Sequence, residues 1–65
     1  MKIYDVATVP LPLNRRILVY AYNIQHPRWV IDEFFRMGPS DHCKVVGNFY
    51  PHNISHWCEL PDEPV

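Results

Sequence analysis

The stretch RILVYAY, residues 16–22, decides the fold of this chain. β-branched and aromatic residues dominate it, and it is too short for a typical helix, so it predicts a β-strand. Side chains alternate between the two faces of a strand. One face carries Ile17, Val19 and Ala21, and the other carries Leu18, Tyr20 and Tyr22. Because neither face is polar, we expect this strand to be central and covered on both faces, either by its own chain or, as the short length favours, by a second copy.

The flanking segments predict further short strands, separated by turns that proline and glycine mark. The segments expected to form strands are 3–9, 44–50 and 54–60. Pro10 and Pro12 exclude a central strand or a helix interior between them, because proline fixes φ and lacks an N–H group. We expect this connection to end in a turn at Asn14. Gly47, inside its strand, indicates a bulge or a close approach of another segment.

Residues 27–37 fit two structures. As a strand, the segment has one face with Trp29, Ile31, Glu33, Phe35 and Met37, and a second face with Val30, Asp32, Phe34 and Arg36. As a helix, it would begin with Pro27 and end just before Gly38, which are the expected end signals. Propensity favours the strand. We therefore expect a mainly β fold, a small antiparallel meander of four to five short strands, with one short helix at 27–37 as the alternative.

Length and composition limit the classes of function. The 65 residues are expected to form a single small domain, 1–65, whose stability as a monomer is marginal. The formal net charge of −1 and the single basic cluster at Arg15 and Arg16 make nucleic-acid binding unlikely. No signal peptide is visible, and the longest apolar run, 17–22, is too short to span a bilayer, so we expect a cytoplasmic protein. The end of the chain, 59–65, is an acidic tail that contains proline.

The sequence does not predict an enzyme or a cofactor. A chain of this length leaves little room for a deep pocket. Ser40, Asp41 and His42 have the residue types of a hydrolase triad, but consecutive residues do not converge in space. Cys43, His52, His56 and Cys58 are weak candidates for a zinc site. Their spacing argues against one, because known structural sites pair their ligands closely at both ends.

Two segments of the chain carry patterns that resemble a known family. Residues 9–20, VPLPLNRRILVY, combine a Leu-Pro turn with a "VLVY"-type strand, and residues 55–64, SHWCELPDEP, fit the pattern (T/S)HW-x-x-LP-x-x-P. These are similar to the opening and closing signatures of a family of short proteins from tailed phages and prophages, a domain of unknown function. The chain differs from the family at Ile3 and Tyr4, where tryptophan is usual, and at Cys58, where an apolar residue is usual.

The resemblance implies a phage-encoded accessory protein in the cytoplasm of the infected or lysogenic bacterial host, and it assigns no activity. In physical terms, Trp57 is the largest apolar side chain that the last predicted strand offers, so we expect it to be a structural anchor together with Ile17 and Val19. His56 alternates with Trp57 and is expected to face solvent or a partner.

Three functions follow as hypotheses. The first is a protein that binds an unidentified host protein, such as a defence protein, and inhibits or modulates it through a β-sheet surface rich in aromatic residues. The alternative is sequestration of a nucleotide-like signalling molecule between subunits, with aromatic rings stacking on the base and arginines holding phosphate. A zinc-stabilised module is the second alternative. The candidate binding residues are Tyr20, Tyr22, Arg15, Arg16, His56 and Trp29. We expect a homo-oligomer.

Overall fold

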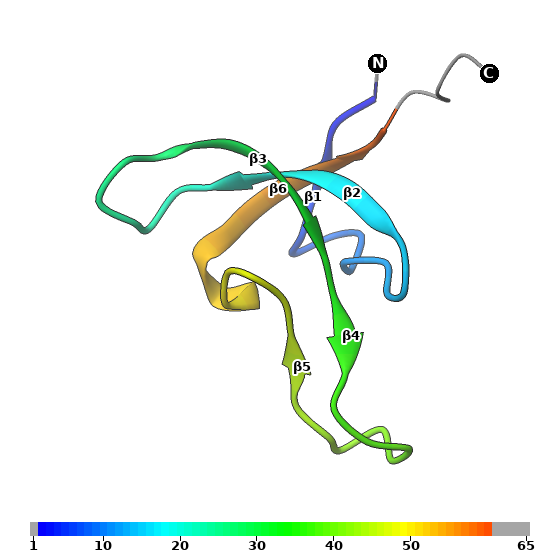
Figure 1. Ribbon diagram of the computed structural model, residues 1–65. Helices are drawn as coiled ribbons and strands as arrows, with labels where there is room; N and C mark the ends of the chain where they lie inside the picture. The colour runs from blue at the N-terminus through cyan, green and yellow to red at the C-terminus, as the bar shows by residue number, and fades with distance from the viewer. Residues whose placement is uncertain (1, 61–65) are drawn as a thin grey trace, which may run out of the picture.

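The computed structural model describes residues 2–60, and in this part of the chain the fold is mainly β (Figure 1). The elements are β1 (Tyr4–Asp5), β2 (Arg16–Ala21), β3 (Arg28–Glu33), β4 (Phe35–Arg36), β5 (Val45–Val46), η1 (Pro51–Asn53) and β6 (Ile54–Glu59). Every strand pair is antiparallel. The mainly β, antiparallel architecture that the sequence predicts is thus confirmed. The predicted tail, 59–65, lies outside the described residues from position 61 onward.

The helix considered at 27–37 does not form. Instead, all six residues of β3 pair with β2, in a register that runs from Arg16 opposite Glu33 to Ala21 opposite Arg28. β-branched and aromatic residues favour the pleated conformation, and the neighbouring β2 supplies a hydrogen-bonding partner for the whole length of the segment. Tertiary pairing therefore outweighs the helix end signals at Pro27 and Gly38.

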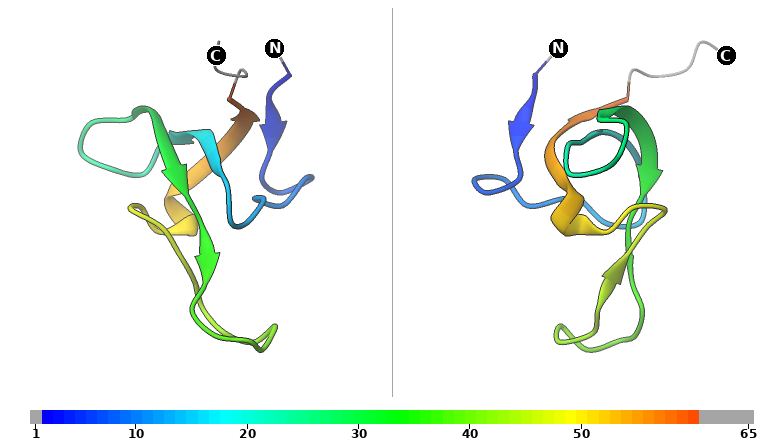
Figure 2. Two further views of the ribbon diagram at one scale, coloured as in Figure 1. Left: turned by 45° about the vertical axis from the view of Figure 1, so that its right-hand side comes forward. Right: turned by 90° about the vertical axis from the view of Figure 1, so that its left-hand side faces the viewer.

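The strand order is more complex than a simple meander. The main sheet has the order β1-β6-β2-β3, and β4 and β5 form a separate two-stranded sheet. Since β6 comes late in the chain and lies between β1 and β2, the centre of the sheet is built from segments that are distant in sequence. The β4–β5 hairpin extends away from the main sheet, as two further views show (Figure 2). Among residues 2–60, no helix is long and apolar enough to cross a bilayer.

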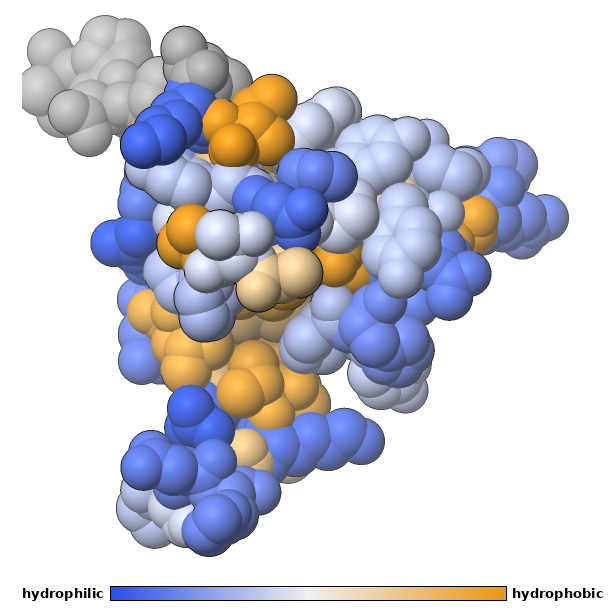
Figure 3. All heavy atoms as spheres, turned by 180° about the vertical axis from the view of Figure 1, so that it is seen from behind, coloured by the Kyte–Doolittle hydropathy of each residue, from blue (hydrophilic) through white to orange (hydrophobic). Residues whose placement is uncertain are grey.

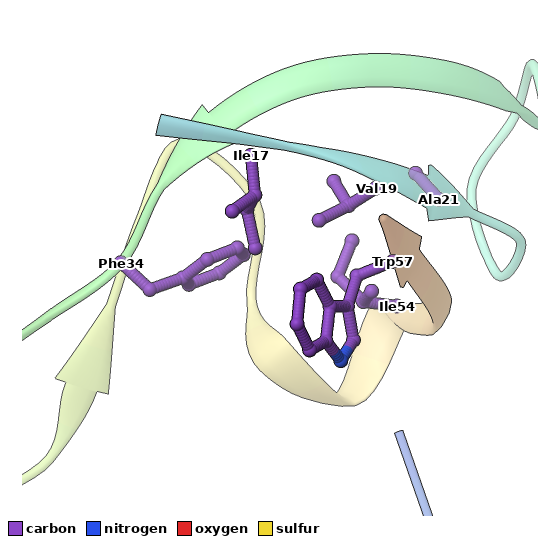
Figure 4. Close-up of a cluster of buried hydrophobic side chains, with 6 residues drawn as sticks. All are labelled: Ile17, Val19, Ala21, Phe34, Ile54 and Trp57. Atoms are coloured by element: carbon purple, nitrogen blue, oxygen red, sulfur yellow. The ribbon is translucent and has the colours of Figure 1, made fainter. Parts of the chain in front are cut away.

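The core lies on one face of β2. Six apolar side chains with little or no exposed surface form it, as Figure 4 shows, and they are Ile17, Val19, Ala21, Phe34, Ile54 and Trp57. Trp57 also donates a hydrogen bond from Nε1 to the backbone oxygen of Val9 at 3.0 Å, and its ring stacks on Tyr4 with centroids 4.6 Å apart. These contacts fasten β6 to both β2 and the N-terminal segment.

The predicted strand at 44–50 is reduced to Val45–Val46 because its later amides have another partner. Asp32 of β3 is 2% exposed and is the one buried charged side chain among the described residues. Its carboxylate accepts hydrogen bonds from the backbone N of Asn48 at 3.0 Å and of Phe49 at 3.1 Å. Those two amides point to a side chain instead of a neighbouring strand, so residues 47–49 form a loop held against β3.

Gly47 lies where another segment approaches the backbone closely, which is one of the two explanations that the sequence predicted for this glycine. A Cβ atom there would lie 2.8 Å from the ring of Phe34 and 3.1 Å from Oδ1 of Asp32.

The predicted turn at Asn14 is also present, with φ at 66°, and Asn14 N donates to the backbone oxygen of Phe34 at 2.7 Å. The strand expected at 3–9 is only Tyr4–Asp5. The amide of Val6 still donates to the backbone oxygen of Ser55, but the amides of residues 7–9 turn back to bind Asp5.

Candidate functional site

A row of exposed apolar side chains follows β3 and β4 on the side turned away from the core. The exposed fractions are 40% for Trp29, 51% for Ile31, 47% for Phe35 and 67% for Met37. We call these four residues the outer row. They fall on the alternate positions of one strand face together with the exposed Glu33, which lies between Ile31 and Phe35, and the intervening Asp32 and Phe34 are buried. The row is thus the outer surface of the same segment whose inner side chains build the core.

The second face of β2 continues this surface. Leu18 lies opposite Ile31, and Tyr20 lies opposite Trp29. Both β2 side chains are half-buried. The rings of Tyr20 and Trp29 meet edge to face, with centroids 5.4 Å apart and planes at 62°. We call the outer row together with Leu18 and Tyr20 the outer face. It comprises three aromatic side chains (Tyr20, Trp29 and Phe35) and three aliphatic ones (Leu18, Ile31 and Met37), in β2, β3 and β4 and just after β4.

His56 reaches the same side of the sheet from β6. It pairs with Tyr20 across β2 and β6 and with Asp5 across β1 and β6. Its Nδ1 lies 2.9 Å from Oγ of Ser55. Three of the candidate binding residues, Tyr20, Trp29 and His56, are therefore neighbours in one structure, on three adjacent strands.

The arginines are not part of this group. Arg15 forms an ion pair with Glu59, at the end of β6, and Arg16 begins β2 opposite Glu33. Tyr22 follows the other end of β2, where its N donates to the backbone oxygen of Asn53 at 2.9 Å. A strand rises roughly 3.3 Å per residue, so about 20 Å separates the arginines from Tyr22. One chain does not bring together the residues suggested for a nucleotide site, and a site shared between two copies stays a prediction.

The suggested zinc ligands do not meet either. Cys58 is buried in β6, Cys43 lies in the β4–β5 hairpin, and His52 lies in η1, stacked on Tyr50 with centroids 5.4 Å apart. In the region 2–60 no three His, Cys, Asp or Glu side chains are grouped so that they could hold a metal ion. The hairpin carries Cys43 away from the sheet that contains Cys58 and His56, and the zinc-stabilised module stays a prediction.

No family model, curated protein or solved structure matches this chain. The resemblance of residues 9–20 and 55–64 to the phage family stays a prediction. The function of the chain has to be argued from its own surface.

Two open hollows lie on other parts of the molecule. The first, about 290 Å³, lies between the N-terminal segment and the β4–β5 hairpin, and its lining includes Leu11, Leu13 and Val45. Seen from behind, hydrophobic atoms gather there above the hydrophilic tip of the hairpin (Figure 3). The second, about 360 Å³, has His52 and His56 in its lining. Both are shallow surface features.

Sequence reasoning missed three of the four outer-row residues and missed Asp32. Trp29 alone was chosen as a binding residue, although the period-two pattern had placed Ile31, Phe35 and Met37 on its face. The alternation of residues 29–37 could have identified the outer row. It was not used in that way because, of the two faces of a strand, the one with more apolar residues is normally assigned to the core. Here Phe34 and Asp32 turn inward instead, since the carboxylate has three backbone N–H partners.

Proposed function

We propose that this chain is a binding protein that attaches to another protein through its outer face. The observation that carries the proposal is the outer row, whose four large apolar side chains are each at least 40% exposed on adjacent elements. Contiguous exposed apolar surface is uncommon on soluble monomers and marks interaction sites. Aromatic residues and methionine are enriched in protein interfaces, and tryptophan is among the residues that contribute most binding energy.

The partner that suits this face is a protein with an apolar surface of its own. Glu33 is the one charged residue in the alternation between Ile31 and Phe35. A basic side chain on the partner would be favourable opposite Glu33, at the rim rather than the centre of the contact. The resemblance to short phage proteins supports a bacterial host protein as the partner, in the host cytoplasm, with inhibition or modulation of that protein, including a defence protein, as the result.

The proposal includes self-association. The chain covers the Ile17 face of β2 completely, whereas Leu18 and Tyr20 on the second face are only half-buried. A second copy adds apolar burial that a chain of 65 residues cannot supply alone.

The experiment compares two substitutions of the same residue type. Ile31 in the outer row is 51% exposed and Ile3, outside it, is 54% exposed. We expect the unmodified chain to capture a stoichiometric partner from lysate of a bacterial host, Ile31→Lys to lose it, and Ile3→Lys to retain it. Circular dichroism checks that both variants fold. Equal capture by the two variants, or no capture by the unmodified chain, would contradict the proposal.

A further inference from the structure

The two edges of the main sheet are very different. β1, at one edge, has only two residues, and the chain turns directly after it. β3, at the other edge, has six residues, all paired to β2 on one side. Within residues 2–60 no strand pairs with its second side. Natural proteins protect sheet edges by short strands, charged side chains, proline or bulges. β1 is protected by its length. In β3 the charged residues lie toward the two ends, the central residues 29–31 are apolar, and residues 28–33 contain no proline.

The charges along β3 favour one direction of pairing with an identical strand. Arg28 begins the strand and Glu33 ends it, and both are exposed, whereas the carboxylate of Asp32 is buried and bound by three backbone N–H groups. Two copies of β3 that run antiparallel place the basic end of each beside the acidic end of the other. A parallel arrangement would place Arg28 beside Arg28 and Glu33 beside Glu33, which is unfavourable for like charges. The strand is therefore self-complementary in the antiparallel direction only.

We propose that β3 pairs antiparallel with β3 of a second copy of this chain. The inference rests on the self-association in the proposed function and places the contact at the edge of β3, so that Leu18 and Tyr20 are not covered by it. Such a contact is isologous, with a two-fold axis that passes through the centre of the paired strands. Main-chain hydrogen bonds would occupy the free edge of β3, and the outer face would stay open to a partner.

The side chains also favour one register. When the two-fold axis lies at Val30, Trp29 of each copy is opposite Ile31 of the other, and Arg28 is opposite Asp32. Aromatic and β-branched residues form stabilising cross-strand pairs, so this register gains two of them. A register centred on Ile31 would place Trp29 opposite Glu33, which loses both apolar pairs. We therefore assign the axis to Val30.

The pairing has a consequence for the binding surface. The two sheets join in the order β1-β6-β2-β3-β3-β2-β6-β1, with the outer faces on the same side. Trp29 and Ile31 of both copies then lie side by side at the centre of the dimer. A partner would meet one continuous apolar surface of twice the size.

Hydrogen exchange tests the location of the contact directly. Sedimentation velocity first establishes the concentrations at which the unmodified full chain is a dimer and a monomer. We expect the backbone amides of β3 to exchange more slowly in the dimer than after dilution, and those of β1 to be unchanged. A dimer in which the β3 amides are not protected would overturn the edge pairing while leaving self-association intact. A monomer at every concentration would overturn both, while partner capture is measured separately.

Charge reversal at the edge gives the second measurement. Arg28→Glu brings an acidic group to the end of the strand where Glu33 of the second copy lies, and we expect it to raise the dimer dissociation constant roughly tenfold. Arg28→Gln, a milder change, should raise it less. Lys2→Glu makes the same change in net charge outside β3 and should leave it unaltered. Equal dissociation constants for Arg28→Glu and Lys2→Glu would overturn the proposal.

Discussion

The carboxylate of Asp32 in β3 binds the backbone of Phe49, since its Oδ2 accepts a hydrogen bond from Phe49 N at 3.1 Å. Its Oδ1 accepts from Asn48 N at 3.0 Å and from Glu33 N at 2.7 Å. One buried charge thus binds the end of β3 and the loop that returns from the β4–β5 hairpin. A carboxylate accepts at several positions at once, which few other side chains do.

Replacement of that carboxylate should be costly. Asp32→Asn keeps the shape but turns one acceptor into a donor that faces backbone N–H groups. Because a hydrogen bond to a charged group contributes about 1.5–3 kcal/mol, we expect the free energy of unfolding to fall by about 2 kcal/mol. Urea denaturation measures it. Asp41→Asn, in the exposed tip of the hairpin, is the control and should change stability little. Equal midpoints for the two variants would contradict the role of Asp32.

Gly47→Ala should destabilise the fold through contact and not through backbone strain. The added Cβ would lie 2.8 Å from the Phe34 ring, which is fully buried and has no space to move into. Overpacking of this kind costs about 1–3 kcal/mol. Gly38→Ala is the matched control, because the one close contact of its Cβ, at 2.7 Å, would be the Sγ of Cys43, the end of a side chain that is half-buried; the Cβ of Cys43 would lie at 3.6 Å. Thermal unfolding should show the larger loss for Gly47→Ala; the reverse order would refute this explanation.

The two tryptophans should respond differently to the same substitution. Trp57→Phe removes the hydrogen bond to the Val9 oxygen and leaves space in the core, so we expect a loss of about 2 kcal/mol in unfolding free energy. Trp29→Phe, on the outer row, should stay within about 0.5 kcal/mol. Chemical denaturation followed by circular dichroism compares them. Similar losses for both variants would show that Trp57 is not the anchor of β6.

Asn14 occupies the left-handed region of the backbone, with φ at 66°. A residue with a Cβ and no locally bonding side chain is penalised there by about 1–2 kcal/mol. Asn14→Ala should therefore lower the unfolding free energy by about 1 kcal/mol, whereas Asn14→Gly should be close to neutral. Differential scanning calorimetry distinguishes the two. If alanine were tolerated as well as glycine, the turn would not depend on this conformation.

The alternation of RILVYAY was sufficient to predict the central strand and the buried set Ile17, Val19 and Ala21. Local patterns also located β6 and the turn at Asn14, because those signals depend on a few neighbouring residues. The sequence did not reveal that β6 inserts between β1 and β2, since the order of strands is set by contacts between distant segments. The shortness of β5 was equally hidden, because it follows from the amides that Asp32 binds across the fold.

The outer row shows where pattern reasoning has a physical limit. An alternating apolar segment has two faces, and the choice of the inward face depends on what packs against it. Asp32 turns inward only because three backbone N–H groups meet it there, and those groups come from Glu33, Asn48 and Phe49. Once that face is inside, Trp29 and Ile31 are left outside.

The position of β6 has a consequence for folding. β1 and β2 have no contact through the sheet until the strand between them has been made, and that strand extends to Glu59. The β2–β3 hairpin forms earlier from local contacts, with one side of β2 still open. Closure of the sheet is therefore a non-local event, of the kind that slows folding.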